Sequence, residues 1–216
     1  MIELLDFEGN TRRNPELWWA AHQGELDKVK ELIEAGADPN AYEENGSGTL
    51  LNFHPKVTRY LLEQGANPDL QRNENILPVL VGVAGFNTEC LKALLDAGAN
   101  PNIISEHNGE TALHHSVCGD RLEEVKSLLE AGADPNKRTH DQRRTFIGSS
   151  DGQCHGETCL HRAAAYGTPD VVKLLLENGA DLSKKDANLQ TPLDWATKHN
   201  REQAITELLV GVTNDE

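Results

Sequence analysis

The sequence predicts an all-α protein built as a stack of similar units, and three observations support this. A phrase of Gly-Ala followed by Asp or Asn recurs at intervals of 29, 33, 34 and 47 residues, beginning at Gly36, Gly65, Gly98, Gly132 and Gly179. Recurrence near 33 residues indicates a repeat architecture. Leucine-rich segments with helical spacing precede these phrases. Hydrophobic residues make up 38% and aromatic residues 5% of the chain, which suits thin helical layers.

Residues 157–182 form the most regular unit and show how each element is expected to arise. Leu160 and the alanines after it have helical spacing in a short first helix, which Gly167 ends. Thr168 can cap a second helix, with proline at its first position and a leucine-rich apolar face. Gly179 suits the left-handed position after that helix. We therefore expect a helix-turn-helix in each unit.

Three segments carry a more specific pattern: TALHHSVCGD from Thr111, TCLHRAAAYG from Thr158 and TPLDWATKHN from Thr191. They resemble the ankyrin repeat, whose signature is TPLH-x-A-A-x-x-G, and the resemblance covers about residues 14–212. It implies one domain over residues 1–216, an ankyrin-repeat solenoid of about six helix-turn-helix repeats with short β-hairpin turns. The expected repeats are 14–42, 43–71, 72–104, 105–137, 156–184 and 185–212.

The resemblance also implies a structural role for the signature histidines. His114 and His161 stand at the histidine position, and Thr111 and Thr158 are their expected hydrogen-bond partners. Such histidines are satisfied within the repeat rather than free for chemistry.

The second repeat is shorter than the others. Only 16 residues separate Thr49 from Gly65, against 21 from Thr111 to Gly132. The missing residues fall in the first helix, so we expect an intact second helix after a collapsed or one-turn first helix. This predicts a notch near Phe53 and the following histidine.

The longest interval contains an insertion at about residues 138–155. The segment from Lys137 to His155 has four lysines and arginines against two aspartates. Thr145-Phe146-Ile147 has strand character and a glycine- and serine-rich turn follows, so an extended basic hairpin is expected.

Charge and composition limit the classes of partner. The formal charge is −15, which disfavours nucleic acid because binding a polyanion requires clustered lysine and arginine. It suits a basic protein partner or serves solubility. The N-terminus lacks the pattern of a signal peptide, and no apolar run could span a membrane. With four cysteines at irregular positions, we expect a cytoplasmic, monomeric protein with free thiols.

Catalytic and metal-binding functions receive little support. The chain lacks G-x-S-x-G, H-E-x-x-H and the phosphate-binding loop motif, so we expect neither an enzyme nor a cofactor. The alternative of another class is a zinc-binding repeat protein that uses Cys154, His155 and Cys159. No paired C-x-x-C supports it.

The resemblance implies protein–protein binding through a concave groove, to which the inserted hairpin would add a basic clamp. An adaptor, or a cytosolic immunity or inhibitor protein that neutralises a toxin or enzyme, fits this class. The expected partner-binding residues lie after the signature alanines, in the turns before the signature, and on the insertion. They are Tyr166, Arg143, Arg144, Phe146, His22, Gln23, Arg72, Asn73, His107, Asn108, His155 and Lys198.

Overall fold

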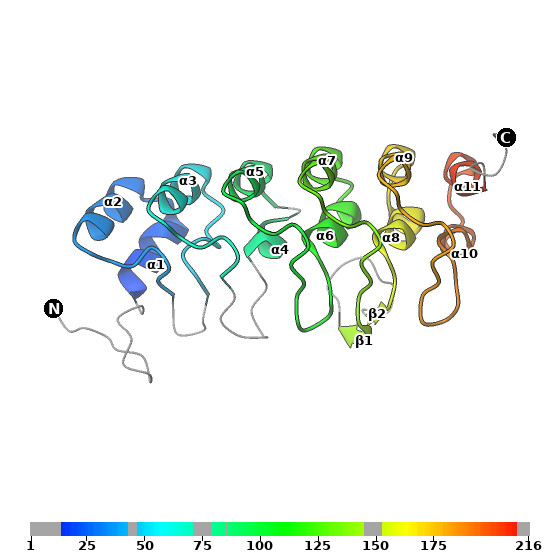
Figure 1. The fold of residues 1–216 in the computed structure, drawn as a ribbon, viewed down its shortest axis with the longest axis horizontal. Coiled ribbons are helices and arrows are strands. Elements are labelled where there is room, and N and C mark those ends of the chain that lie inside the picture. The colour runs from blue at the N-terminus through cyan, green and yellow to red at the C-terminus, as the bar shows by residue number, and fades with distance from the viewer. Residues whose placement is uncertain (1–13, 43–46, 71–78, 85, 145–152, 211–216) are drawn as a thin grey trace. The chain divides into compact units, whose positions relative to one another are not determined.

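The leucine-rich segments are helices in the computed structural model, and most are preceded by a shorter helix (Figure 1). The structure describes residues 14–42, 47–70, 79–84, 86–144 and 153–210. The longer helices are α2 Leu26–Glu34, α3 Pro55–Glu63, α5 Thr88–Asp96, α7 Leu122–Glu130, α9 Pro169–Glu177 and α11 Gln203–Val210. The helices that precede them are α1 Pro15–Gln23, α4 Val79–Val83, α6 Ala112–Cys118, α8 Cys159–Tyr166 and α10 Pro192–Lys198.

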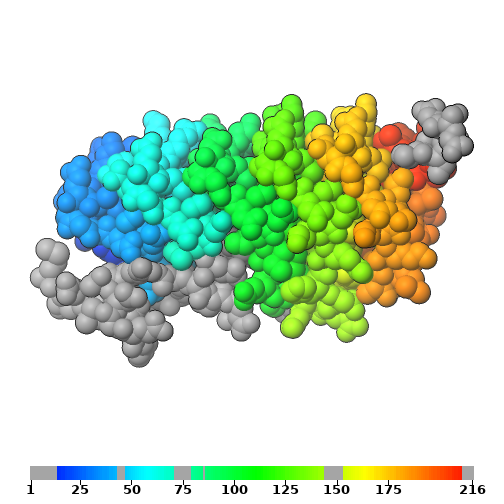
Figure 2. Space-filling view, viewed as in Figure 1, coloured from blue at the N-terminus to red at the C-terminus, as the bar shows by residue number. Residues whose placement is uncertain are grey.

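The chain divides into two units, Met1–Asn100 and Pro101–Glu216. In the first unit α1 packs on α2, α2 on α3, α3 on α5, and α4 on α5. In the second unit α8 packs between α6 and α10, while α9 packs between α7 and α11. Within the second unit, the surfaces of successive repeats meet side by side (Figure 2). This is the ankyrin-repeat solenoid architecture predicted from the sequence, mostly helical with short strands.

Most of the buried side chains in each unit are aliphatic, as the composition suggested. Leu61, Leu91 and Leu94 are fully buried in the first unit. Leu128 and Leu160 are examples in the second. Burying a leucine contributes roughly 1.5–3 kcal/mol, so these thin layers depend on many such contacts. Among the described residues, no helix is long and apolar enough to cross a membrane.

The recurring glycine takes a backbone conformation that glycine adopts most readily. All five are left-handed, with φ of 95°, 89°, 85°, 89° and 83° at Gly36, Gly65, Gly98, Gly132 and Gly179. In this region a residue with a Cβ atom is strained. The glycine therefore ends each longer helix and turns the chain back.

The last residue of the GADPN phrase links one turn to the next within each unit. The Asn136 side-chain oxygen accepts from the Asp181 N–H at 2.8 Å, and its amide donates to the Gly179 carbonyl at 2.8 Å. Asn102 makes the same two bonds with Asp134 and Gly132. These bonds satisfy backbone groups that would otherwise lack partners at the turns.

The second repeat lacks its first helix, as its length predicted. Residues 47–54 contain no helix, and Asn52 organises the turn that replaces it. The Asn52 Oδ1 atom accepts from the His54 N–H at 2.8 Å, and its Nδ2 atom donates to the Thr49 carbonyl at 2.7 Å. Leu51 packs so close to Gly82 that a Cβ atom there would lie 2.6 Å from the leucine. The α3 helix that follows is intact.

The insertion forms an antiparallel hairpin. Strand β1 Asp141–Arg144 pairs with β2 Gln153–His155, in the register Asp141 to His155 and Arg144 to Gln153. The sequence placed strand character at residues 145–147 and a turn at residues 148–152, which lie outside the described residues.

Candidate functional site

The signature histidines are structural anchors in the second unit. The Nδ1 atoms of His114 and His161 lie 2.9 Å from the hydroxyls of Thr111 and Thr158. Each Nδ1 also accepts from the threonine N–H at 3.2 Å. The Nε2–H of His161 donates to the Gln190 carbonyl at 3.0 Å, which ties α8 to the next repeat. These contacts agree with the role that the resemblance implied.

His114 differs from His161 at its second ring nitrogen. The His114 Nε2 atom is buried and has no hydrogen-bond partner among the described residues. Burial, with the nearby charge of Arg162 as a second cause, lowers the pKa of His114 to about 3. His114 is therefore neutral at neutral pH.

The residue after the signature position pairs with an acidic residue of the preceding turn. This occurs in three successive repeats of the second unit. In each, a side chain of the first helix contacts a carboxylate of the turn that precedes the helix. The pairs are His115 with Glu110 at 3.0 Å, Arg162 with Glu157 at 2.8 Å, and Trp195 with Asp186 at 2.9 Å.

Arg162 is fully buried at the centre of a network that sequence reasoning did not identify. Its Nη2 atom donates to Glu157 Oε1 at 2.5 Å and to Glu110 Oε1 at 2.8 Å. Burial would lower the pKa of Arg162, but the two carboxylates outweigh it and raise that pKa. Burial would likewise raise the pKa of Glu157, but the guanidinium and several hydrogen bonds lower it on balance. The network is therefore ionic.

Glu157 joins this network to the base of the hairpin. Its Oε2 atom accepts from the Thr139 hydroxyl at 2.7 Å and from the His155 N–H at 2.6 Å. Thr139 lies two residues before β1, and His155 ends β2. The two ends of the insertion are thus fastened through one carboxylate to Arg162 on α8.

The cysteines of the second unit surround the same guanidinium. Arg162 lies 3.7 Å from the Cys154 sulfur and 3.9 Å from the Cys118 sulfur. Burial raises the pKa of the Cys154 thiol to about 12 and that of Cys159 well above its ordinary range. A cysteine binds a metal ion as the thiolate, which the raised pKa values disfavour, and no group of three or more His, Cys, Asp or Glu among the described residues could hold a metal ion. The zinc alternative gains no support from this part of the chain.

The predicted groove residues of the helices lie at the ends of first helices. Tyr166 is half-buried, with its ring centroid 5.0 Å from that of His199, and Lys198 is exposed. In the first unit, His22 stacks on Trp18 at 3.8 Å between ring centroids, and Gln23 is exposed. Tyr166, at the end of α8, thus lies close to the end of α10, the first helix of the last repeat.

The predicted turn and hairpin residues differ in accessibility. His107 and Arg143 are exposed and His155 is half-buried. Asn108 is only 3% exposed, and its amide donates to Glu110 at 2.8 Å, so it belongs to the buried network. Four further predictions lie outside the described residues: Arg72, Asn73, Phe146 and the side chain of Arg144.

Several large apolar side chains are exposed instead. Leu189 is 74% and Phe86 70% exposed, and neither was singled out from the sequence. Phe53, at the predicted notch, is 40% exposed, and its ring centroid lies 6.0 Å from that of Phe86. One signal could have revealed Leu189: aligned repeats carry glycine at its position.

Comparison with known proteins gives one curated relative and two solved structures of note. The ankyrin repeat domain-containing protein SAT10 of Stachybotrys chartarum is 32% identical over 123 residues, which are 55% of this chain and 6% of that protein. The ankyrin repeat domain of Bcl-3, of the IkappaB protein family, is 27% identical with a TM-score of 0.74, covering 94% of this chain and 84% of that one. A chain from the Bdellovibrio bacteriovorus predatory endopeptidase Bd0816 in complex with immunity protein Bd3460 is 28% identical with a TM-score of 0.70. It covers 92% of this chain and 98% of that one.

Family matches extend over most of the sequence. The family model described as "Ankyrin repeats (3 copies)" matches residues 49–139 and 143–215, and "Ankyrin repeat" matches residues 14–43. The matched segments contain the left-handed glycines, the signature histidines and the helix pairs described above. The chain belongs to the ankyrin repeat family, whose repeats are protein–protein interaction modules.

Proposed function

We propose that this chain is a non-enzymatic module that binds a partner protein through its first helices and the β1–β2 hairpin. The observation that carries the proposal is the buried Arg162–Glu157 pair, with both side chains at 0% exposure. It fastens the base of the hairpin to α8, so strand β1, which bears Arg143, is already positioned when a partner binds. Such preorganisation lowers the entropic cost of association.

The helical part of the surface supplies an aromatic anchor. Tyr166 is half-buried against His199, so its ring is held in place while part of it faces solvent. Tyrosine is enriched among the residues that contribute most to protein–protein binding. Lys198, the last residue of α10 and the neighbour of His199 in sequence, adds a cation.

A second candidate narrows the partner to an enzyme that this chain inhibits. The support is the likeness to a chain of the complex between the predatory endopeptidase Bd0816 and immunity protein Bd3460, over 98% of that chain. The formal charge of −15 suits a partner with a basic surface. In this candidate the chain acts by occupying the surface of the enzyme, without chemistry of its own.

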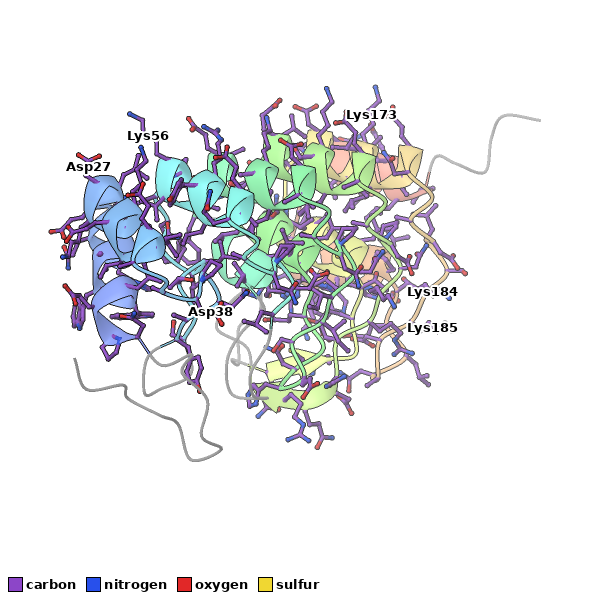
Figure 3. All side chains as sticks on the ribbon, turned by 60° about the vertical axis from the view of Figure 1, so that its left-hand side comes forward. Asp27, Asp38, Lys56, Lys173, Lys184 and Lys185 are labelled. Atoms are coloured by element: carbon purple, nitrogen blue, oxygen red, sulfur yellow. The ribbon has the colours of Figure 1, made fainter. Side chains whose placement is uncertain are left out.

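The first experiment measures partner capture. The full chain is immobilised and incubated with native lysate of the source organism, and bound proteins are quantified by mass spectrometry. Tyr166→Ala and Arg143→Glu each reduce capture of the partner at least tenfold, a loss of about 1.4 kcal/mol. The matched control is Lys173→Glu, which reverses an exposed charge on α9 (Figure 3).

The outcomes separate the two candidates. Equal capture by the wild type, both surface variants and Lys173→Glu contradicts binding through this surface. The inhibitor candidate is tested on the purified partner by measuring its enzymatic activity at saturating chain. Unchanged activity at saturation contradicts inhibition and leaves the binding module.

A further inference from the structure

Asparagine followed by glycine is a chemically labile sequence, and this chain contains it at residues 45–46, 108–109 and 178–179. The backbone nitrogen of the residue after asparagine can attack the side-chain amide carbon, and glycine allows this approach because it has no Cβ atom. The first of the three pairs lies outside the described residues. The other two lie in opposite surroundings, so the fold can select between them.

Asn108 and Gly109 are held in a buried and crowded turn. Asn108 is 3% exposed, and its side-chain amide donates to Glu110 Oε2 at 2.8 Å. The Gly109 N–H donates to the Ser105 carbonyl at 2.7 Å. A Cβ atom on Gly109 would lie 2.7 Å from a ring atom of His140, so the space around this glycine is filled. The amide carbon and the attacking nitrogen are therefore fixed in place and shielded from water.

Asn178 and Gly179 follow α9 and face solvent. Both are exposed, and nothing lies within 4 Å of the position that a Cβ atom on Gly179 would take. Asn178 is the C-cap residue, and its Nδ2 atom donates to the Leu174 carbonyl at 2.8 Å. The Gly179 N–H donates to the Leu176 carbonyl at 3.0 Å. Both bonds belong to the last turn of the helix, where helices fray, and fraying frees the amide and the attacking nitrogen together.

We propose that Asn178–Gly179 is a site of spontaneous deamidation, at which the fold exposes one asparagine to modification by water. In the first step the Gly179 nitrogen forms a bond to Asn178 Cγ and loses its proton. The Cγ–Nδ2 bond breaks, and ammonia leaves with that proton. Water then adds to either carbonyl carbon of the imide ring and opens it. The product is aspartate, or isoaspartate, in which the main chain runs through the side chain, and water is the only other reactant.

The product weakens the turn that follows α9. It replaces the Asn178 amide, which donates to the Leu174 carbonyl, with a carboxylate that cannot donate. The new negative charge lies at the C-terminus of α9, where the helix dipole disfavours it. Isoaspartate also lengthens the main chain just before Gly179, whose carbonyl accepts from the Asn136 amide at 2.8 Å. Deamidation thus loosens a contact that joins two successive turns of the second unit.

The test follows both described Asn-Gly pairs in one sample. The full chain is incubated at pH 8 in buffer and, in parallel, in guanidinium chloride that unfolds it, and deamidation of each asparagine is quantified over time by peptide mass spectrometry. In guanidinium chloride Asn108 and Asn178 should deamidate at similar rates, because the Asn-Gly sequence alone then sets the rate. In buffer Asn178 should deamidate at least about tenfold faster than Asn108, because only its turn opens by fraying.

Asn178→Asp tests the effect of the product on the turn. It carries the carboxylate from the start, and its thermal unfolding midpoint should lie below that of the wild type. Asn188→Asp is the matched control, because Asn188 is also exposed but lies in a turn outside the helices. It adds the same charge away from a helix C-terminus and should lower the midpoint less.

The deamidation rates do not depend on a partner, so the inference goes beyond the proposed function and is tested separately from it. If Asn178 deamidates in buffer no faster than Asn108, the fold protects both asparagines and the inference is overturned. If the two asparagines already differ tenfold in guanidinium chloride, the sequence rather than the fold makes the selection, and the inference is likewise overturned. A midpoint of Asn178→Asp at or above that of the wild type contradicts the weakening of the turn.

Discussion

The guanidinium of Arg162 lies 2.8 Å from the carboxylate of Glu110, although 52 residues separate them in sequence. Glu110 precedes α6, Arg162 lies in α8, and Glu157 completes a buried cluster with two carboxylates and one guanidinium. His115, 11% exposed, contacts Glu110 from the other side at 3.0 Å. The cluster thus connects two repeats and the base of the hairpin, and it connects the stability of the second unit to the position of its insertion.

Replacing Arg162 with alanine should strongly destabilise the protein. The change leaves Glu110 and Glu157 buried without their cation, and breaking a buried ion pair from one side costs about 3–5 kcal/mol. Urea unfolding followed by circular dichroism measures the loss. The free energy of unfolding should fall by several kcal/mol if the network carries this part of the fold.

Arg59→Ala is the matched control. Arg59 lies 3.5 Å from Glu89, and both side chains are more than half exposed, at 54% and 68%. Exposed pairs of this kind contribute about 0–1 kcal/mol. Similar losses of unfolding free energy in Arg162→Ala and Arg59→Ala would show that the buried cluster contributes no more to stability than an exposed ion pair.

Stability should decrease as the pH falls below the ordinary pKa of histidine, and His114 should account for part of the decrease. The folded pKa of His114 is lowered to about 3, so between about pH 6.5 and 3 the unfolded chain binds a proton that the folded chain does not. The free energy of unfolding therefore falls with falling pH, by up to about 1.4 kcal/mol per pH unit for this group. Urea titrations between pH 7.5 and 5 measure the slope.

His114→Gln should flatten that slope, because the group that gains a proton on unfolding is gone. His107→Gln is the control, since His107 is exposed in the folded protein. An unchanged slope in His114→Gln would contradict a buried neutral imidazole. Glu157, whose pKa is lowered, adds a loss of stability only below about pH 4.5, beneath this window.

The repeat architecture could be predicted from the sequence because its determinants are local and recur. The left-handed turn after each longer helix favours glycine, so Gly36 and its four counterparts mark the unit length directly. The lost first helix of the second repeat followed from counting residues between Thr49 and Gly65. Each signal lies within a single repeat.

The Arg162 network could not be predicted in the same way. Its partners come from three segments, and Arg162 occupies a position after the signature histidine that tolerates many residue types. Alignment alone does not reveal that two carboxylates converge there. Tyr166 and Arg143 were expected to contact a partner, and that remains a prediction, because accessibility alone does not identify a binding residue. Leu189 was discoverable, since it replaces an aligned glycine.

The four thiols should differ sharply in reactivity. Cys90, Cys154 and Cys159 are fully buried, whereas Cys118 is half-buried at the end of α6. Burial raises the pKa of Cys118, so it should react slowly. In the native protein Ellman's reagent should modify one thiol slowly and the other three only through unfolding; in urea it should modify all four.

Cys118→Ser tests the assignment of the slow native reaction. The variant should show no native phase and three thiols in urea. A native phase that persists in Cys118→Ser, or more than one thiol that reacts before unfolding, would contradict the burial of Cys90, Cys154 and Cys159.

Asp69→Asn should stabilise the first unit by completing a turn contact that the second unit already has. Asp69 accepts from the Asn100 N–H at 2.9 Å, but a carboxylate cannot donate. The Asn136 side chain accepts from the Asp181 N–H and also donates to the Gly179 carbonyl. An asparagine at position 69 would have the Gly98 carbonyl as the corresponding acceptor. One added hydrogen bond should raise the free energy of unfolding by about 0.5–1.5 kcal/mol. The reverse change, Asn136→Asp, should lower it by a similar amount. If urea unfolding shows that Asp69→Asn and Asn136→Asp both raise, or both lower, the free energy of unfolding, the donor role of the amide is contradicted.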